Sequence, residues 1–197
     1  MNNIAGQTSA SHLPLAAMTE HDLASRDATI DVGLLILRLG IGAAILQAGL
    51  IKASDFPMTV QFLTDAGWRL PAFAAFMVTA TETLSGVALL LGVLTPLAGC
   101  AALSSMLCAW AVNVSAAAFW SEPFNIPFLI GLGGAALLFA GAGVYSVDSR
   151  ILTRFTWSPR VKMALLGLAF VAAIVTWLAL YGVNPIHFVA PPATPAP

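Results

Sequence analysis

Residues 71–110 read PAFAAFMVTATETLSGVALLLGVLTPLAGCAALSSMLCAW. Two apolar runs, at about 72–94 and 97–119, flank the dipeptide Thr95-Pro96. Each run is long enough for a helix to cross a hydrocarbon core of about 30 Å, which takes roughly 20 residues. Thr95 suits a helix N-cap and Pro96 a first helical position. Because so short a connection joins antiparallel neighbours, the stretch predicts a transmembrane helical hairpin.

Three further apolar runs, at about 33–51, 126–145 and 163–181, bring the expected number of spans to five. The chain of 197 residues is 59% hydrophobic and 9% charged, whereas soluble domains carry about 25% charged residues. The runs lack the alternation of barrel strands. We therefore expect an all-α integral membrane protein, a four-helix bundle with a fifth transmembrane helix. A net charge of -1 without a basic run argues against nucleic acid as a partner.

The expected organisation follows these runs. Residues 1–31 form a polar tail without the features of a signal peptide, 32–148 a four-helix unit, 149–162 a basic loop, 163–182 the fifth helix and 183–197 a Pro/Ala-rich tail. The positive-inside rule places the basic loop in the cytoplasm, so the N-terminus lies inside and the C-terminus outside a bacterial plasma membrane. The loop carries Arg150, Arg154, Arg160 and Lys162. The segment from Ser54 to Leu70 is either a helix in the interface plane or a solvated loop.

Glu82 lies near the middle of the second span, where a charge costs about 2.5 to 3.5 kcal/mol on insertion scales. Thr79, Ser85 and Gly86 share its helix face, so this face is expected to point into the bundle. Arg38 in the first span is the expected partner of Glu82.

Three interpretations of Arg38 and Glu82 stay open. The two side chains form a structural polar contact, or they line a site for a quinone head group, a small anion or a relayed proton, or Arg38 extends to the lipid head groups. Gln47 is a further candidate for hydrogen bonding inside the bundle. Lys52 ends the first apolar run and completes the set of candidate site residues.

Glycines crowd the fourth span. Gly131, Gly133 and Ala136 match the dinucleotide-binding pattern G-x-G-x-x-A, but they lie within an apolar span without the preceding strand that this site needs. Gly131, Gly134 and Gly141 are better interpreted as small residues that allow close helix packing, within this chain or against a partner.

Residues for catalysis or metal binding are sparse. The three histidines, His12, His21 and His187, lie outside the spans, so no metal site is expected. Neither a Ser, His and acid set nor a phosphate loop is recognisable. Cys100 and Cys108 lie about 12 Å apart along one helix, too far to bridge, and are expected to be apolar packing residues.

Several short motifs together resemble the DoxX family over about residues 32–148. They are Leu37-Arg38-Leu39-Gly40 leading to Gly49 and Lys52, then Gly67 and Pro71, then Glu82 with Gly86, Gly92 and Thr95, and finally Gly143, Tyr145, Ser146 and Asp148. The resemblance implies a four-helix membrane unit. One branch of the family is a small subunit of thiosulfate:quinone oxidoreductase, and other members accompany redox or respiratory proteins. Arg38, Lys52 and Glu82 are the candidate functional positions, whereas the fifth span and both tails depart from the family pattern.

These observations lead us to expect a non-catalytic accessory or assembly subunit of a membrane respiratory or quinone-linked redox complex. The fourth or fifth span would pack on the larger partner, and the chain would hold no cofactor of its own apart from a quinone or lipid. The alternative is a quinone-interacting subunit of a membrane oxidoreductase. A small transporter is less favoured, because inverted repeats with broken helices are not evident.

Overall fold

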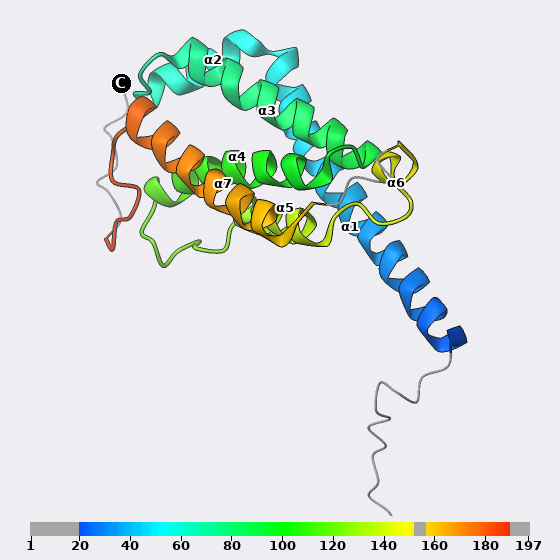
Figure 1. Cartoon of the computed structure of the whole chain (residues 1–197). Coiled ribbons are helices and arrows are strands. Elements are labelled where there is room, and N and C mark those ends of the chain that lie inside the picture. Colours follow the sequence, from blue (N-terminus) through cyan, green and yellow to red (C-terminus); the bar gives the residue numbers. More distant parts are fainter. Residues whose placement is uncertain (1–19, 152–156, 190–197) are drawn as a thin grey trace, which may run out of the picture.

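The computed structural model describes residues 20–151 and 157–189, with side chains from Asp27 onward. Within these ranges the regular structure consists of helices alone (Figure 1). The helices are α1 (Glu20–Ser54), α2 (Phe56–Asp65), α3 (Pro71–Leu91), α4 (Thr95–Ser115), α5 (Ile126–Ala140), α6 (Val147–Ile151) and α7 (Pro159–Leu180). The expected all-α fold is confirmed.

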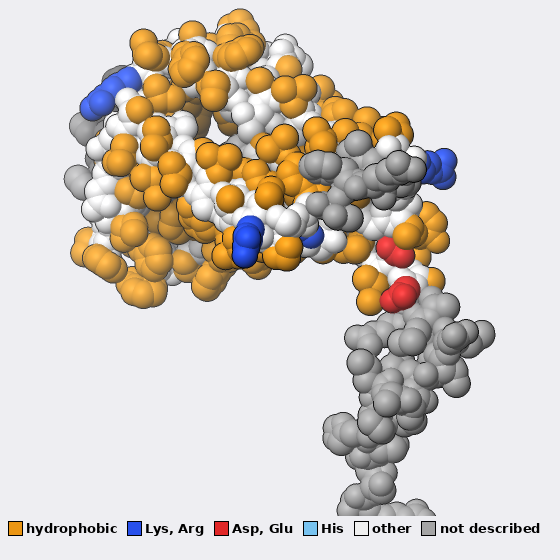
Figure 2. All heavy atoms as spheres, viewed as in Figure 1, with side chains coloured by type: hydrophobic (Ala, Val, Ile, Leu, Met, Phe, Trp, Pro, Cys, Tyr) orange, Lys and Arg blue, Asp and Glu red, His pale blue; other side chains and the backbone are white. Residues whose placement is uncertain are grey.

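Four of the described helices, α1, α3, α4 and α7, are long and apolar enough to cross a membrane, and α5 is a shorter apolar helix. α4 is central, because it contacts α3, α5 and α7, while α1 packs against α3 and α5. Apolar side chains cover much of the face in Figure 2. An apolar exterior around a packed interior is what lipid as a solvent requires, so the protein is a multi-pass membrane protein.

α1 begins at Glu20, so the segment that the sequence assigns to an N-terminal polar tail is helical from residue 20 onward. The helix has 35 residues and is therefore about 52 Å long, well beyond the 30 Å or so of a hydrocarbon core. Its first turns project away from the other helices (Figure 1). A helix continues through polar residues because the apolar run that follows already supplies its nucleus. Residues 1–19 lie outside the described part of the chain.

α5 is shorter than the predicted span of 126–145, because it ends at Ala140. Gly141 follows with a φ of +84°, a positive value that glycine adopts without steric cost. Gly131 and Gly134 pack against α4 of the same chain, where Gly134 meets the backbone oxygen of Gly99. Space around Gly141 is open, so this glycine ends the helix and is not a packing contact.

α2 is a helix, which decides between the two interpretations of the segment 54–70. Asp55 accepts a hydrogen bond from the Met58 backbone nitrogen at 3.1 Å and so caps the helix. Leu63 is buried, and Phe56 and Val60 pack beside it, whereas Met58 and Phe62 are exposed. Two exposed apolar side chains suit a helix that lies at the membrane interface, and this location stays a prediction.

The turn between α3 and α4 is held by a distant carboxylate. Asp148 accepts hydrogen bonds from the backbone nitrogens of Leu94 at 2.8 Å and Thr95 at 3.1 Å. The N-cap residue is Leu94 in a left-handed conformation, and the buried Thr95 hydroxyl bonds to none of the residues that the structure describes, so the prediction of a Thr95 cap is wrong. Because Asp148 satisfies these amides from 53 and 54 residues away, no local capping residue is needed.

The last two segments differ partly from expectation. The basic loop predicted at 149–162 contains the end of α6 and the start of α7, and Arg154 lies outside the described residues. Within the C-terminal segment, residues 183–189 form no helix, but the Phe119 backbone nitrogen donates to the His187 oxygen at 2.7 Å. This part of the predicted tail is therefore attached to the bundle, and residues 190–197 lie outside the described part.

Candidate functional site in the helix bundle

Glu82 is paired with Lys52. The Lys52 ammonium lies 2.6 Å from Glu82 Oε2 and also donates to the Ala48 backbone oxygen at 3.3 Å. Glu82 is 1% exposed, and its neighbours Ser85 and Gly86 are buried too, so the prediction that this face points into the bundle is confirmed. The Lys52 side chain is 30% exposed. A carboxylate at this depth is compensated by a cation that reaches it from the helix end.

Arg38 does not contact Glu82, so the predicted pairing is wrong. Its guanidinium donates to the backbone oxygens of Ala142 at 2.7 Å and Tyr145 at 2.5 Å, and the residue is 2% exposed. A side chain at Gly92 would collide with this guanidinium. Arg38 therefore ties α1 to the loop after α5 beside the α3–α4 turn. This arrangement supports a structural role for Arg38.

The register of α1 against α3 explains why Glu82 pairs with Lys52 and not with Arg38. α1 and α3 are antiparallel and approach closely at three glycines, with Gly42 against Leu90, Gly49 against Thr83 and Gly86 against Leu46. These contacts put Glu82 level with position 50 of α1, one turn or less from Lys52. Arg38 lies 12 residues away, about 18 Å along the axis. The prediction counted the level of each residue from an assumed span end, which does not give the register of α1 against α3.

Gln47 is exposed on the outer surface of α1, so the expectation that it hydrogen-bonds inside the bundle is wrong. It lies beside a shallow hollow formed with Leu46, Leu50 and Leu90. Gln47 therefore belongs to a different surface from the Lys52–Glu82 pair. Of the four candidate residues, the fold brings together Lys52 and Glu82 and separates Arg38 and Gln47 from them.

A cavity of about 550 Å³ opens beside the ion pair, within the range of about 300 to 1,000 Å³ that is typical of ligand sites. Its walls come from α1, α2, α3, α4 and α7, and Figure 2 shows the molecular surface hollowed on this side. Most lining side chains are apolar. The polar ones are Lys52, Thr59, Trp68, Thr81, Glu82, Ser104, Ser105, Asn113 and Thr176. The cavity wall is therefore largely apolar and carries a smaller number of polar side chains.

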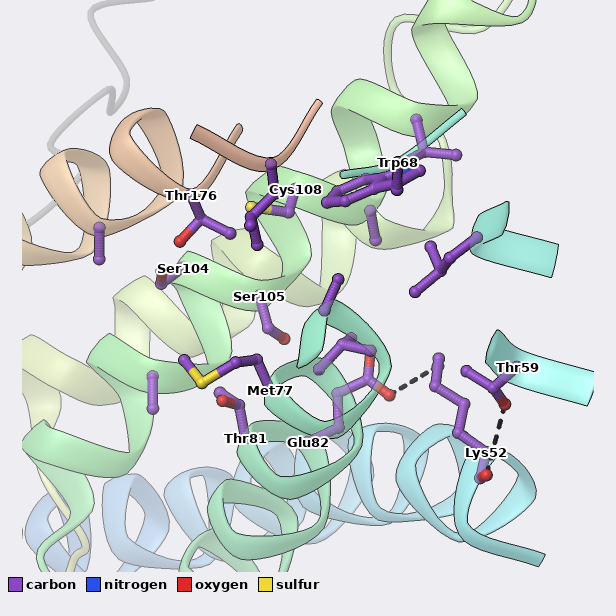
Figure 3. A pocket seen from close by; sticks show the side chains of 18 of the residues that line it. Lys52, Thr59, Trp68, Met77, Thr81, Glu82, Ser104, Ser105, Cys108 and Thr176 are labelled. Atoms are coloured by element: carbon purple, nitrogen blue, oxygen red, sulfur yellow. Dashed lines mark hydrogen bonds and ion pairs between the residues drawn. The ribbon is translucent and has the colours of Figure 1, made fainter. Parts of the chain in front are cut away.

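Ser105 is the further polar residue that the sequence interpretation missed. It is 8% exposed, and its hydroxyl has no hydrogen-bond partner among the described residues. Ser105 and Glu82 both line the cavity from neighbouring helices (Figure 3). Of the buried polar atoms without a partner in the described part of the chain, only the Ser105 hydroxyl belongs to a cavity residue. The polar pair Ser104-Ser105 in the middle of an apolar run was the signal that could have pointed to it.

The site has hydrogen-bonding capacity left for a ligand. The bond from Lys52 uses Oε2 of Glu82, which leaves Oε1 as an acceptor. An ammonium has three N–H donors, and two are engaged with Ala48 and Glu82. A hydroxyl without a partner in a buried position costs free energy, so a ligand that bonds to Ser105 recovers this cost. Together the three groups can bind a polar head group at the wall of an apolar cavity.

Among the described residues, no group of three or more His, Cys, Asp and Glu side chains is placed to hold a metal ion. Cys100 and Cys108 are free thiols, as expected, and each donates to a backbone oxygen of α7. The Cys100 thiol lies 3.2 Å from the Leu165 oxygen. Both cysteines line the cavity and contribute to the contact between α4 and α7.

Comparison with known proteins gives one match. Residues 33–116 match the family model described as DoxX. This range runs from α1 to the end of α4 and includes Arg38, Lys52, Glu82 and Ser105. It does not include the motif at 143–148, so that part of the resemblance stays a prediction. No curated protein and no solved structure matches the chain. Residues 33–116 are therefore similar to the DoxX family, and α5, α6 and α7 lie outside the matched range.

Proposed function

We propose that this protein is a non-catalytic accessory subunit that binds a quinone for a larger redox complex in a bacterial plasma membrane. One observation carries the proposal: a mostly apolar cavity contains the buried Lys52–Glu82 pair and the unpartnered Ser105 hydroxyl. The ligand that suits this cavity has an apolar body and a polar head.

Charge argues for a neutral head group. The positive charge of Lys52 is compensated by the carboxylate of Glu82 at 2.6 Å, so the site as a whole carries no net charge. An anionic head group such as a fatty acid carboxylate would place a second negative charge next to Glu82 at an unfavourable energy. A neutral head group meets no such penalty.

Hydrogen-bond donors favour a quinone among neutral head groups. The Lys52 ammonium and the Ser105 hydroxyl are two donors that line the cavity, and a quinone ring carries two carbonyl acceptors. Trp68 in the cavity wall offers an aromatic surface to a ring. The family adds support, since DoxX proteins are in general small membrane proteins linked to redox or quinone-associated complexes.

The projecting part of α1 supports the proposal of a larger partner. Ile30 is 50% exposed and Val32 is 44% exposed, and the helix extends beyond the rest of the bundle (Figure 1). A helix that extends beyond its own bundle leaves a surface that another subunit can cover, and apolar side chains suit such a contact within a membrane. The predicted cytoplasmic location of this end would bring the partner to the inner side of the membrane.

Quinone binding is testable with the isolated chain in lipid nanodiscs. We expect a decyl benzoquinone to quench the fluorescence of Trp68 in a saturable way, and Ser105→Ala to weaken binding about three- to tenfold, the value of one hydrogen bond. Because the Ser105 hydroxyl has no hydrogen-bond partner among the described residues, its removal is expected to leave the fold unchanged. The measurement is a titration of tryptophan emission, and Trp68→Phe is expected to reduce the quenched fraction while the other four of the five tryptophans still emit.

Thr79→Val is the matched control for that titration. Thr79 also carries a buried hydroxyl without a partner in the described part of the chain, but it lies outside the cavity, so its replacement is expected to leave quinone affinity unchanged. Equal affinity in the Ser105→Ala, Thr79→Val and unmodified proteins would contradict the assignment of the site. Absence of saturable quenching in the unmodified protein would contradict quinone binding.

The partner is testable by purification in mild detergent followed by mass spectrometry. We expect a membrane redox enzyme to copurify with the unmodified protein and to be lost with Ile30→Glu, which places a charge on the projecting helix. Ile151→Glu is the control, because Ile151 is 74% exposed on α6 and receives the same change. A protein that purifies as a lone monomer, or equal losses in both variants, would contradict the proposed contact.

A further inference from the structure

The cavity is elongated. On α4 its wall runs from Leu97 to Asn113, a rise of 16 residues or about 24 Å. On α7 it runs from Leu168 to Leu180. A space of about 550 Å³ drawn out along two helices is a slot. Such a slot holds an extended molecule better than a compact ring alone.

The two ends of the slot differ in polarity. Beyond Glu82 toward the α3–α4 turn, α3 contributes no further residue to the wall. The wall there consists of Leu97, Cys100 and Ala101 of α4 and Leu168 of α7. The Cys100 thiol is engaged with the Leu165 oxygen, so this end offers only apolar surface. A polar head group is therefore bound near Glu82 and Ser105, and the turn end suits hydrocarbon.

The slot opens toward lipid between α3 and α7. Met77 on α3, Leu97 on α4 and Leu168 on α7 line the cavity and are also exposed, at 41%, 43% and 53%. We call these three residues the side window. Side chains that belong both to a cavity and to the lipid-facing surface mark the place where the two spaces join (Figure 3 shows Met77 at the cavity wall).

We infer that the ligand carries a long apolar tail, which passes from the Lys52–Glu82 end through the side window into the bilayer. This inference rests on the proposed function and adds that the ligand is a quinone of the prenylated, lipid-soluble class. It also assigns a role to α7, which lies outside the residues that match the family model. α7 supplies Leu168, Ala172 and Thr176 to the wall, so the added helix completes the slot.

Photolabelling tests the path of the tail. The probe is a benzoquinone with a diazirine at the end of a decyl tail, bound to the full chain in nanodiscs, irradiated and mapped by mass spectrometry. We expect label at Leu97, Ala101 and Leu168, and loss of this label when excess unlabelled decyl quinone is present. The lipid-facing positions Val171 and Ile174 of α7 report background labelling, because they are exposed and lie outside the cavity.

A variant that fills part of the slot with a larger side chain provides the second measurement. Ala101→Phe is expected to abolish the competed label at Leu168 while quinone still quenches Trp68, and Ala136→Phe on exposed α5 surface is the matched control. Quenching of Trp68 with label spread equally over Leu168, Val171 and Ile174 would overturn the tail path and leave the proposed function standing. Absence of quenching would overturn both. Competed label at the side window supports the inference even if Ala101→Phe fails to fold.

Discussion

Lys52→Met is expected to destabilise the helix bundle by about 2 kcal/mol or more, because it leaves the Glu82 carboxylate buried without a cation. Breaking a fully buried pair costs about 3 to 5 kcal/mol, and we expect less here because the Lys52 side chain is 30% exposed and partly hydrated. Methionine is similar in length to lysine and resembles its apolar stem, so the stability lost in Lys52→Met is due mainly to the missing positive charge. The measurement is reversible unfolding of the purified protein in detergent.

The double variant Lys52→Met with Glu82→Met decides whether the pair itself causes the loss. Removing both charges leaves no unpaired group, so we expect the double variant to be more stable than Lys52→Met alone. Gln47→Met is the control, because Gln47 is exposed on the same helix and bonds to nothing in the described chain. If the stability changes of Lys52→Met alone and Glu82→Met alone simply add in the double variant, the 2.6 Å contact contributes nothing to stability.

Gly86→Ala is expected to destabilise the contact between α1 and α3 by about 3 kcal/mol, at the upper end of the usual cost of overpacking. A Cβ at Gly86 would lie 2.6 Å from the Leu46 backbone nitrogen and 2.7 Å from its Cα. Backbone atoms of a helix cannot move aside as a flexible side chain can, so the two helices must separate. Separation would also shift Glu82 away from Lys52. Unfolding measured in the same detergent gives the stability.

Gly40→Ala provides the matched control for Gly86→Ala. Gly40 lies in α1, and a Cβ there would meet nothing within 4 Å. Alanine is favoured over glycine in a helix by about 0.5 to 1 kcal/mol, so this variant is expected to be as stable as the unmodified protein or slightly more stable. Similar stabilities for Gly86→Ala and Gly40→Ala would show that the close approach of α1 and α3 is not required.

The sequence was informative wherever a property depends on one segment. The lengths of the apolar runs predicted α3, α4 and α7 to within a few residues, because lipid must be crossed by about 20 apolar residues in a helix. The depth of Glu82 in its run predicted burial, and the residue is 1% exposed. The ends of α1 and α5 were predicted less well. Polar residues extend α1, and a single glycine ends α5 early.

The candidate site could be predicted only in part. Glu82 and Lys52 were both selected from the sequence, but Glu82 was assigned to Arg38 because the level of each residue was counted from an assumed start of the first span. The cavity and the role of Ser105 were not predicted. Both depend on how α3, α4 and α7 are spaced, and no pattern within one helix contains this information.

By itself the sequence determined that the chain is a bundle of membrane helices with a buried carboxylate. The length of a span and the free-energy cost of a charge within it depend on the residues of that one segment. Only the tertiary structure decided that Lys52 is the partner of Glu82, that Arg38 holds a loop, and that a slot opens beside Ser105. The physical reason is register. Contacts such as Gly49 with Thr83 set how far one helix slides along another, and these contacts join residues that are distant in the chain.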